Sequence, residues 1–289
     1  MLDYFKSPMN YIGNKFKLLP QIIPLFPKDM DTFVDLFCGG LDVTLNVEAK
    51  KKICNDREDH IIDFYNALKG KTGDEVHNKI MEVVAQYDLS KTNQEGYLQL
   101  RADYNKEHTW YLFYSLIAYS FNNQLRFNNK NEFNMPFGKN KSCYNERLQS
   151  RLQGFVDRIN KLGNNVTFLC SDFRDVDLSS LTEKSFLYAD PPYLITTASY
   201  NEKNGWVEKD EEDLLSLLDE LSERKIKFGL SNVIEQNGKI NSILSKWSEK
   251  YNVIDLSYNY SNCNYHKKNR STIDTREVFV CNYEVEESV

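Results

Sequence analysis

The stretch Asp31-Thr32-Phe33-Val34-Asp35-Leu36-Phe37-Cys38-Gly39-Gly40 decides the fold that we expect for this chain. Its apolar residues predict a short buried strand over 31–37. Cys38-Gly39-Gly40 ends that strand sharply before helical spacing begins over 42–51. A strand, a glycine turn and a helix are the way in which an open α/β sheet presents a nucleotide-like cofactor. The glycines do not complete a G-x-G-x-x-G pattern, so the dinucleotide fingerprint is only partly met.

A second strand, 53–56, ends in Asp56, 16 positions beyond Gly40. An acidic residue at about this separation commonly receives the ribose hydroxyls of a nucleotide cofactor. Asp56 also suits the start of the amphipathic helix expected over 58–68, so a helix cap is the competing interpretation. Upstream, Met9–Lys15 contains a G-x-K pattern that could place an ammonium beside an anion, although a surface loop explains it more simply.

The pattern changes between 58 and 162, and this change predicts an insertion. Helical spacing continues over 74–87, 94–104, 108–121 and 145–162. The segment 122–144 has no clean period and is rich in Asn, Lys, Phe and Gly. It is too long and too basic for a loop that only connects two helices.

Strands and helices alternate again after the insertion. Strands are expected over 166–170, 185–189, 225–230, 251–257 and 277–283, and helices over 208–223 and 234–250. This alternation predicts an α/β fold, with a mainly parallel sheet covered on both faces and antiparallel strands at its end. We expect one domain from 1–57 and 163–289, with 58–162 inserted as a second, mainly helical domain.

The motif Asp190-Pro191-Pro192-Tyr193 follows the apolar strand 185–189. Two prolines fix φ near −65° and remove two backbone donors, so the chain leaves the strand on a stiff path with carbonyls available as acceptors. A carboxylate, a carbonyl and an aromatic face are what a site needs to hold a planar amine. A strand-ending turn with a buried tyrosine explains an isolated motif of this kind equally well.

Composition excludes several classes of protein. No window of 18 apolar residues and no signal-peptide pattern occurs, so we expect a soluble, cytoplasmic protein. The six cysteines form no C-x-x-C pair and are expected to be reduced, and no metal site is expected. The net charge of −6 argues against a uniformly basic nucleic-acid binder, but basic residues concentrate over 121–152 and 258–276.

With these pieces in place, the chain resembles the Dam-type DNA adenine-N6 methyltransferases, the D-P-P-Y amino methyltransferases whose target-recognition region lies between the cofactor motifs and D-P-P-Y. The resemblance runs almost end to end and implies a Rossmann-like methyltransferase sheet. It rests on eight motifs in family order: M-N-Y-I-G-N-K at 9–15, F-V-D-L-F-C-G-G at 33–40, N-D at 55–56, F-N-x-x-x-R at 121–126, E-F-N-M-P-F-G-K at 132–139, S-D-F at 171–173, D-P-P-Y at 190–193 and R-E-V-F-V-C-N-Y at 276–283.

The resemblance implies S-adenosylmethionine as the methyl donor. Phe37 to Gly40 would surround its methionine end, Asp56 would accept the ribose hydroxyls, and Asp172 and Phe173 would bond and stack on its adenine. The full set that the resemblance assigns to the cofactor is Tyr11, Lys15, Asp35, Phe37, Cys38, Gly39, Gly40, Asp56, Asp172 and Phe173. Leu41-Asp42 departs from the small residues that relatives often carry after the glycines.

The implied catalytic residues are Asp190, Pro191, Pro192 and Tyr193. A target adenine inside a duplex must be flipped out at a cost of a few kcal/mol. Stacking on Tyr193 would return roughly 1–3 kcal/mol. Hydrogen bonds from N6 to the Asp190 carboxylate and the Pro191 carbonyl would make the amine more nucleophilic and stabilise its developing positive charge.

For double-stranded DNA, the resemblance makes Arg126 the reader of a base, because a guanidinium can bond guanine O6 and N7. A phosphate contact or a structural ion pair is the competing role for Arg126. Asn122, Gln124, Pro136 and Lys139 fall at matching recognition positions, although Asn123 and Gln124 differ from the residues usual in GATC-specific relatives. Three further basic residues are expected to contact phosphates, which position the protein on DNA without specifying sequence: Lys267, Lys268 and Arg270.

Three other functions stay open at this point. Cytosine-N4 methylation uses similar geometry, although Asp in place of Ser before P-P-Y favours adenine by family habit. A non-catalytic DNA-binding module is a second alternative, against which Asp190 and Tyr193 argue. A nucleotide-dependent oxidoreductase is the weakest, because the glycine pattern is incomplete. As a DNA-modifying protein it is expected at the nucleoid, with a restriction endonuclease as a candidate partner. The recognition sequence, the membership of a restriction-modification system and the oligomeric state are not encoded in any motif.

Overall fold

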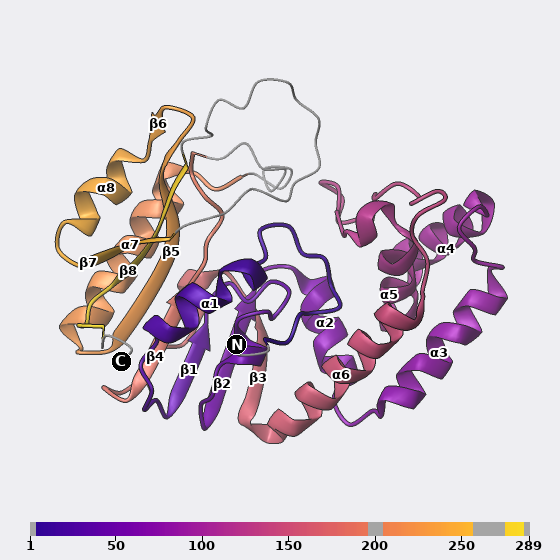
Figure 1. Cartoon of the computed structure of the whole chain (residues 1–289), viewed down its shortest axis with the longest axis horizontal. Coiled ribbons are helices and arrows are strands. Elements are labelled where there is room, and N and C mark those ends of the chain that lie inside the picture. The colour runs from indigo at the N-terminus through magenta and orange to yellow at the C-terminus, as the bar shows by residue number, and fades with distance from the viewer. Residues whose placement is uncertain (1–3, 196–204, 257–274, 286–289) are drawn as a thin grey trace. The chain divides into compact units, whose positions relative to one another are not determined.

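The computed structural model describes residues 4–195, 205–256 and 275–285 (Figure 1). The chain divides into two compact units, and each is described by itself. The helical unit comprises 1–16, 38–46 and 56–170, and the sheet unit comprises 17–37, 47–55 and 171–289. The helical unit contains the whole of the predicted insertion, 58–162. The functional domain boundaries expected from the sequence stay a prediction.

The strands of the sheet unit lie in the order β2-β1-β4-β5-β8-β7. Adjacent strands are parallel from β2 to β5, whereas β8 is antiparallel to both β5 and β7. This arrangement confirms the expected α/β fold with a mainly parallel sheet and antiparallel strands at its end. The bounds are β1 (Thr32–Asp35), β2 (Lys51–Asp56), β4 (Ser185–Ala189), β5 (Lys227–Gln236), β7 (Asn252–Leu256) and β8 (Thr275–Cys281).

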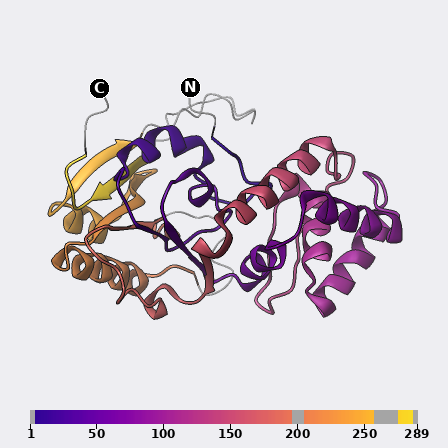
Figure 2. The same ribbon diagram turned by 90° about the horizontal axis from the view of Figure 1, so that it is seen from below.

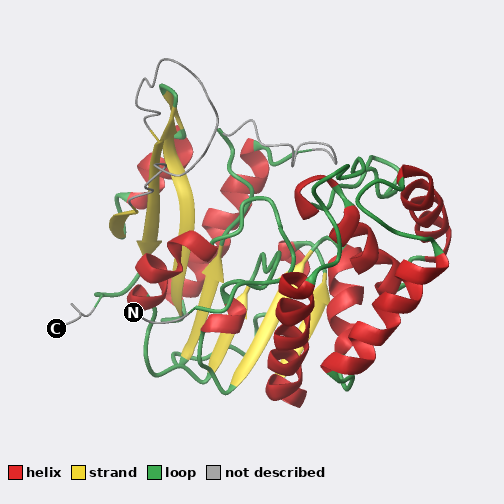
Figure 3. Cartoon of the chain, turned by 45° about the vertical axis from the view of Figure 1, so that its right-hand side comes forward, coloured by secondary structure: helices red, strands yellow, loops and turns green. Residues whose placement is uncertain are grey.

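Helical segments cover both faces of this sheet (Figure 3). Phe186 of β4 is level with Lys227, and the next residue of β4 is level with Phe228, so Phe186 and Phe228 point to opposite faces. On one face, Phe26 follows α1 (Leu19–Ile22) and η2 (Ile23–Leu25) and packs on Phe186, with 4.7 Å between ring centroids. On the other face, Trp247 of α8 (Ser242–Ser248) packs on Phe228 at 5.9 Å, and α7 (Glu208–Glu223) packs beside it.

In the helical unit, α3, α4, α5 and α6 gather as one bundle, drawn in purple and pink in Figure 2. The central helix α5 is apolar all round, and all its residues from Leu112 to Tyr119 are buried. Such a helix forms only where neighbours cover every side of it. A capping box at Thr72 starts α3. The bounds are α2 (Asp59–Leu68), α3 (Gly73–Gln86), α4 (Gln94–Glu107), α5 (Trp110–Tyr119), α6 (Glu146–Leu162) and β3 (Val166–Cys170).

Two expected helices differ in the structure. In place of a helix over 42–51 there is a single 3-10 turn, η3 (Thr44–Asn46), and β2 already begins at Lys51. The helix expected over 234–250 begins only at Ser242, because β5 continues to Gln236 and turns back into β6 (Lys239–Ile240). Asn237 and Gly238 both have positive φ, which is the requirement of a tight two-residue hairpin.

In the part of the chain that the structure describes, no helix combines the length and the apolar character needed to cross a membrane.

Candidate functional site

The carboxyl edge of the sheet brings two of the sequence motifs together. β1 and β4 are adjacent and parallel, and Asp35 is level with Tyr188. The backbone N–H of Leu36 donates to the Tyr188 carbonyl at 3.0 Å, so the ladder holds to the last residue of each strand. Phe37 and Asp190 therefore follow the ends of neighbouring strands, which is where open α/β sheets bind ligands.

At this edge, the Tyr193 hydroxyl lies between two carboxylates. It donates to Glu277 Oε1 at 2.9 Å, and Asp190 Oδ1 lies 3.3 Å from the same hydroxyl. Burial, with the negative charges of Asp190 and Glu277, raises the pKa of Tyr193 well above its usual value, so the phenol keeps its proton. The sequence assigned Glu277 no site role, although it lies in the R-E-V-F-V-C-N-Y motif and at the start of the last predicted strand.

Three aromatic rings meet beside Phe37. The ring centroids of Phe37 and Phe173 are 5.6 Å apart, and Trp206 lies 5.7 Å from Phe37 and 5.6 Å from Phe173. We call these three residues the aromatic cluster. Phe173 is buried, whereas Phe37 and Trp206 are half-buried. Trp206 was not predicted as a site residue, because it follows a long polar segment with no strand or helix pattern of its own.

Trp206 is held by a buried carboxylate. Its indole N–H donates to Glu211 Oε2 at 2.6 Å, and the other oxygen of Glu211 accepts from Asn232 at 3.1 Å and Asn241 at 2.8 Å. Glu211 is fully buried at the start of α7, and this burial raises the pKa of its carboxyl. Three donors around one carboxylate fix the indole in a single orientation.

Asp172, which was predicted to hydrogen-bond the adenine of the cofactor, forms an ion pair with Arg174, two residues further along the chain. Its Oδ1 accepts from the Arg174 backbone N–H at 3.1 Å and from the Arg174 guanidinium at 3.1 Å. The same guanidinium bonds Asp210 at 2.6 Å and Asp213 at 2.8 Å and lies 4.5 Å from the Phe173 ring centroid. Partial burial of the Arg174 guanidinium lowers its pKa. The hydrogen bonds to the three carboxylates raise it by more, so the pKa of Arg174 lies above its ordinary value.

The glycine turn belongs to the helical unit and is fixed from both sides. The Gly39 N–H donates to Asp56 Oδ2 at 2.9 Å, and the Gly39 carbonyl accepts from the Tyr65 hydroxyl at 2.5 Å. Gly39 has φ +42°, and a Cβ there would lie 3.1 Å from the Tyr11 ring. A Cβ on Gly40 would lie 3.2 Å from Tyr11 as well. The predicted residues Tyr11, Gly39, Gly40 and Asp56 are thus brought together.

Asp56 and Lys15 are both buried. The Asp56 Oδ1 accepts from the Glu58 N–H at 3.0 Å, so this carboxylate holds the backbone just before α2 as well as the glycine turn; α2 itself begins at Asp59 without a side-chain cap. Burial raises its pKa. The Lys15 ammonium donates to the Gly13 carbonyl at 3.3 Å.

Asp42, where the sequence departs from the family pattern, is buried beneath the glycine turn. Its Oδ1 accepts from the Ser7 N–H at 2.9 Å. Its Oδ2 has no hydrogen-bond partner among the described residues. Burial raises the pKa of this carboxyl to about 6.

Residues 119–138 form an irregular hairpin, which we call the basic hairpin. Main-chain bonds join Phe121 N–H to Pro136 O at 2.8 Å and Asn134 N–H to Arg126 O at 2.9 Å. The tip of the hairpin is closed by a hydrogen bond of 2.9 Å from the Asn128 N–H to the Glu132 carbonyl. Half of the eight predicted DNA-binding residues therefore lie on one compact element, where Pro136 is exposed, and Lys139, which is also exposed, comes directly after it.

Arg126 is partly held within this hairpin. Its Nε donates to Asn134 Oδ1 at 2.8 Å and its Nη2 to the Asn134 carbonyl at 3.1 Å. A guanidinium carries five N–H donors, so these two bonds orient the side chain and leave donors for another acceptor. The Asn122 carbonyl accepts from the Asn10 amide at 2.8 Å. Lys267, Lys268 and Arg270 lie outside the described residues, and their phosphate role stays a prediction.

His60, to which the sequence assigned no role, anchors the basic hairpin to α2. Its ring stacks on Phe127, with 4.1 Å between centroids and 3° between planes, and its Nε2 lies 3.3 Å from the Asn131 carbonyl. Its Nδ1 hydrogen-bonds the Tyr104 hydroxyl. Asp59 accepts from the Asn131 amide at 3.2 Å. No local pattern in the sequence reveals contacts between residues so far apart.

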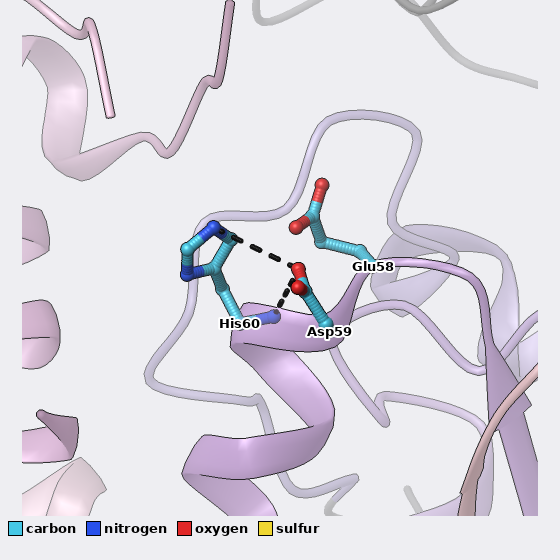
Figure 4. Close-up of side chains that lie close together, drawn as sticks. All are labelled: Glu58, Asp59 and His60. Atoms are coloured by element: carbon cyan, nitrogen blue, oxygen red, sulfur yellow. Dashed lines mark hydrogen bonds and ion pairs between the residues drawn. The ribbon is translucent and has the colours of Figure 1, made fainter. Parts of the chain in front are cut away.

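Glu58, Asp59 and His60 lie close together at the start of α2 (Figure 4). Their oxygen and nitrogen atoms could in principle face one cation. The two ring nitrogens of His60 are already bonded to Tyr104 and Asn131, so the imidazole acts as a structural link and we assign no metal to this group.

Comparison with known proteins identifies the family to which the chain belongs. The profile described as D12 class N6 adenine-specific DNA methyltransferase matches residues 11–262. The chain is 42% identical over 285 residues to the type II methyltransferase M.FokI of Planomicrobium okeanokoites, covering 97% of this chain and 43% of the relative.

It is also 42% identical over 287 residues to the modification methylase StsI of Streptococcus sanguinis, with the same shares of both chains. The DNA adenine methylase of Escherichia coli K12 is 28% identical over 233 residues, covering 78% of this chain and 79% of the relative. The chain thus spans less than half the length of the first two relatives. Glu277 lies beyond the residues that the family profile matches.

Proposed function

Because the chain belongs to the D12 class of N6 adenine-specific DNA methyltransferases, we propose that it methylates N6 of adenine in double-stranded DNA with S-adenosylmethionine as donor. The observation that carries this proposal is the carboxyl edge of the sheet. There a carboxylate and a tyrosine of the D-P-P-Y motif stand beside the end of the strand that carries the F-C-G-G motif.

The residues of each unit suit the proposed cofactor. When bound, S-adenosylmethionine supplies an electrophilic methyl group on a sulfonium. In the helical unit, Gly39 and Gly40 present backbone in place of side chain, and Asp56 keeps lone pairs beyond its two N–H partners for ribose hydroxyls. In the sheet unit, the aromatic cluster suits an adenine ring, and Asp172, oriented by Arg174, suits its amino group.

The chain's own contribution to the reaction is binding and orientation. The Asp190 carboxylate and the Pro191 carbonyl would accept hydrogen bonds from N6, which raises electron density on a nitrogen whose lone pair is otherwise delocalised. Asp190 would afterwards accept the proton that N6 loses once it carries the methyl group supplied by the donor. Tyr193 would stack on the flipped base and repay part of the roughly few kcal/mol that flipping requires.

DNA recognition is assigned to the basic hairpin. Arg126 would read a guanine, since the two bonds to Asn134 orient its guanidinium beforehand. The neighbouring residues Asn122, Gln124, Pro136 and Lys139 would contact the same stretch of DNA. Lys267, Lys268 and Arg270 would hold phosphates, as their charge suggests.

The relatives named as modification methylases suggest a setting for this activity. We place the chain beside a restriction endonuclease, protecting cellular DNA by methylation. Co-expression with a restriction endonuclease that cleaves the sequence methylated by this protein should leave cell viability intact, whereas a strain with an inactive methylase should lose viability.

Incubation of the protein with tritiated S-adenosylmethionine and mixed genomic DNA, followed by nucleoside mass spectrometry, tests the reaction. N6-methyladenine is the expected product. N4-methylcytosine, or no labelled nucleoside, would contradict the proposal. Asp29→Ala, an exposed carboxylate before β1, is the matched control and should keep the wild-type rate.

A further inference from the structure

The backbone around Tyr193 has few constraints of its own. Two prolines precede it and supply no N–H groups, and β4 has ended four residues earlier at Ala189. A side chain in such a segment samples several rotamers unless a partner holds its far end. Among the described residues, the Tyr193 hydroxyl donates to Glu277 Oε1 at 2.9 Å, with Asp190 Oδ1 as a more distant acceptor at 3.3 Å.

Glu277 itself is rigidly placed. It is level with Val233 of β5 and with Leu256 of β7, so the sheet holds its backbone on both sides. β8 runs antiparallel to β5, and its first residues therefore lie at the edge where the parallel strands end. This topology brings a glutamate 84 positions from Tyr193 to the D-P-P-Y motif. Only 8% of the Glu277 surface is exposed.

The two carboxylates compete for a single phenol proton. The hydroxyl is 2.9 Å from Glu277 and 3.3 Å from Asp190, so the stronger hydrogen bond goes to Glu277. A tyrosine directed at Asp190 instead would both tilt the ring and occupy the oxygen that the target amine is to use. Glu277 opposes this by accepting the shorter hydrogen bond from the phenol, which keeps its proton.

We propose that Glu277 is a positioning residue for methyl transfer: by accepting the Tyr193 hydroxyl, it fixes the ring on which the target base stacks and directs the phenol proton away from Asp190. This inference rests on the proposed function, because it assigns Tyr193 to the target base. Glu277 touches neither substrate nor donor in this role, and its effect passes through one hydrogen bond.

A double-mutant cycle on the full chain tests the proposal, with Glu277→Ala, Tyr193→Phe and the double variant. Loss of the hydrogen bond should lower kcat by about 10- to 100-fold, because small misplacements of reacting groups have effects of this size. The affinity for S-adenosylmethionine, measured by calorimetry, should stay within about twofold. The double variant should be no slower than the slower single variant, since both remove the same bond.

Glu277→Gln keeps a carbonyl oxygen that accepts from the phenol, so it should retain at least about a third of the wild-type kcat. Glu235→Ala, a half-exposed glutamate of β5, is the matched control and should match the wild type. The proposal would be overturned if the fold-reductions in kcat of the two single variants multiplied in the double variant. It would also be overturned if Glu277→Gln were as slow as Glu277→Ala, or if Glu277→Ala bound S-adenosylmethionine more weakly.

The wild-type assay separates the two levels of inference. A wild type without methyl transfer contradicts the proposed function, whereas an active wild type with independent single effects contradicts only the role of Glu277. If Glu277→Ala does not fold, as judged by thermal melting, Glu277→Met, which keeps the length of the side chain but provides no oxygen acceptor, is compared in wild-type and Tyr193→Phe backgrounds. An effect present only when the hydroxyl is present supports the proposal, and an equal effect in both overturns it.

Discussion

The carboxyl edge of the sheet and the basic hairpin position functional side chains in different ways. At the edge, Glu277 meets Asp190 and Tyr193 from a segment 84 positions away from Tyr193, and strand pairing sets their places. In the hairpin, Arg126 is held by Asn134, eight residues away, through bonds that do not depend on the sheet. Under the proposed function, the chemistry that must be aligned closely would be built on buried strands, and sequence recognition on a local turn.

This difference predicts separable effects. Changes at the sheet edge should alter the rate on every DNA sequence, and changes in the hairpin should alter which sequence is methylated. A hairpin variant that lowers the rate equally on all DNA would break the comparison.

Asp190→Ala should have the largest effect. Loss of the acceptor for N6 removes charge stabilisation in the transition state, which lowers kcat by about 10²- to 10³-fold or more. Binding of S-adenosylmethionine, followed by calorimetry, should change little. Wild-type kcat in this variant would contradict the assigned mechanism.

Trp206→Ala should come next, with donor affinity as the measured quantity. Removing one ring of the aromatic cluster should weaken S-adenosylmethionine binding by about 10-fold, as expected for roughly 1–3 kcal/mol of stacking. Trp206→Phe should restore part of the affinity. In a Trp110→Phe, Trp247→Phe background, where Trp206 is the remaining tryptophan, the donor should quench fluorescence; unchanged emission at saturating donor would exclude the cluster from the adenine site.

Arg126→Ala should have a smaller but more selective effect. It should relax discrimination at one base pair by about 1–3 kcal/mol, measured by methylation-sensitive sequencing of a randomised DNA library. Asn134→Ala should relax the same base pair less, because the guanidinium remains but is no longer oriented. Lys268→Ala is the contrasting variant: it should weaken binding to all sequences and reduce the salt dependence. Equal effects of Arg126→Ala and Lys268→Ala across sequences would refute this division.

The sequence predicted the sheet well because apolar runs ending in Gly, Pro or Asp are local signals. The strand before Phe37 and the strand before Asp190 were predicted, and their adjacency confirms the α/β interpretation. The helix expected over 234–250 was wrong at its start because Asn237-Gly238, a hairpin signal, lay within an apparently helical pattern.

The missed site residues share a physical reason. Glu277 and Trp206 act through partners set by strand register and by a buried carboxylate, and His60 acts through stacking on Phe127 in a distant hairpin. No periodicity encodes such pairs. The roles assigned to Asp56, Asp172 and Arg126 stay predictions, although the structure adds a bonded partner to each of them.

The buried carboxyl of Asp42 makes the stability of the protein depend on pH. Its pKa rises from an ordinary value of 3.8 in the unfolded chain to about 6 in the fold. Between these values the folded state binds more protons than the unfolded state, so the free energy of unfolding falls as pH rises through this window. The full contribution is present below about pH 4 and is lost above about pH 6, a difference on the order of 3 kcal/mol.

Asp42→Asn keeps an oxygen for the Ser7 N–H and removes the charge, so it should stabilise the protein at pH 7.5 and do so much less at pH 4.5. Urea unfolding at the two pH values measures this, with the exposed Asp29→Asn as control. An equal change at both pH values would contradict it. Asp42 would then be a residue whose buried negative charge weakens the fold at neutral pH, next to the glycine turn that the chain keeps.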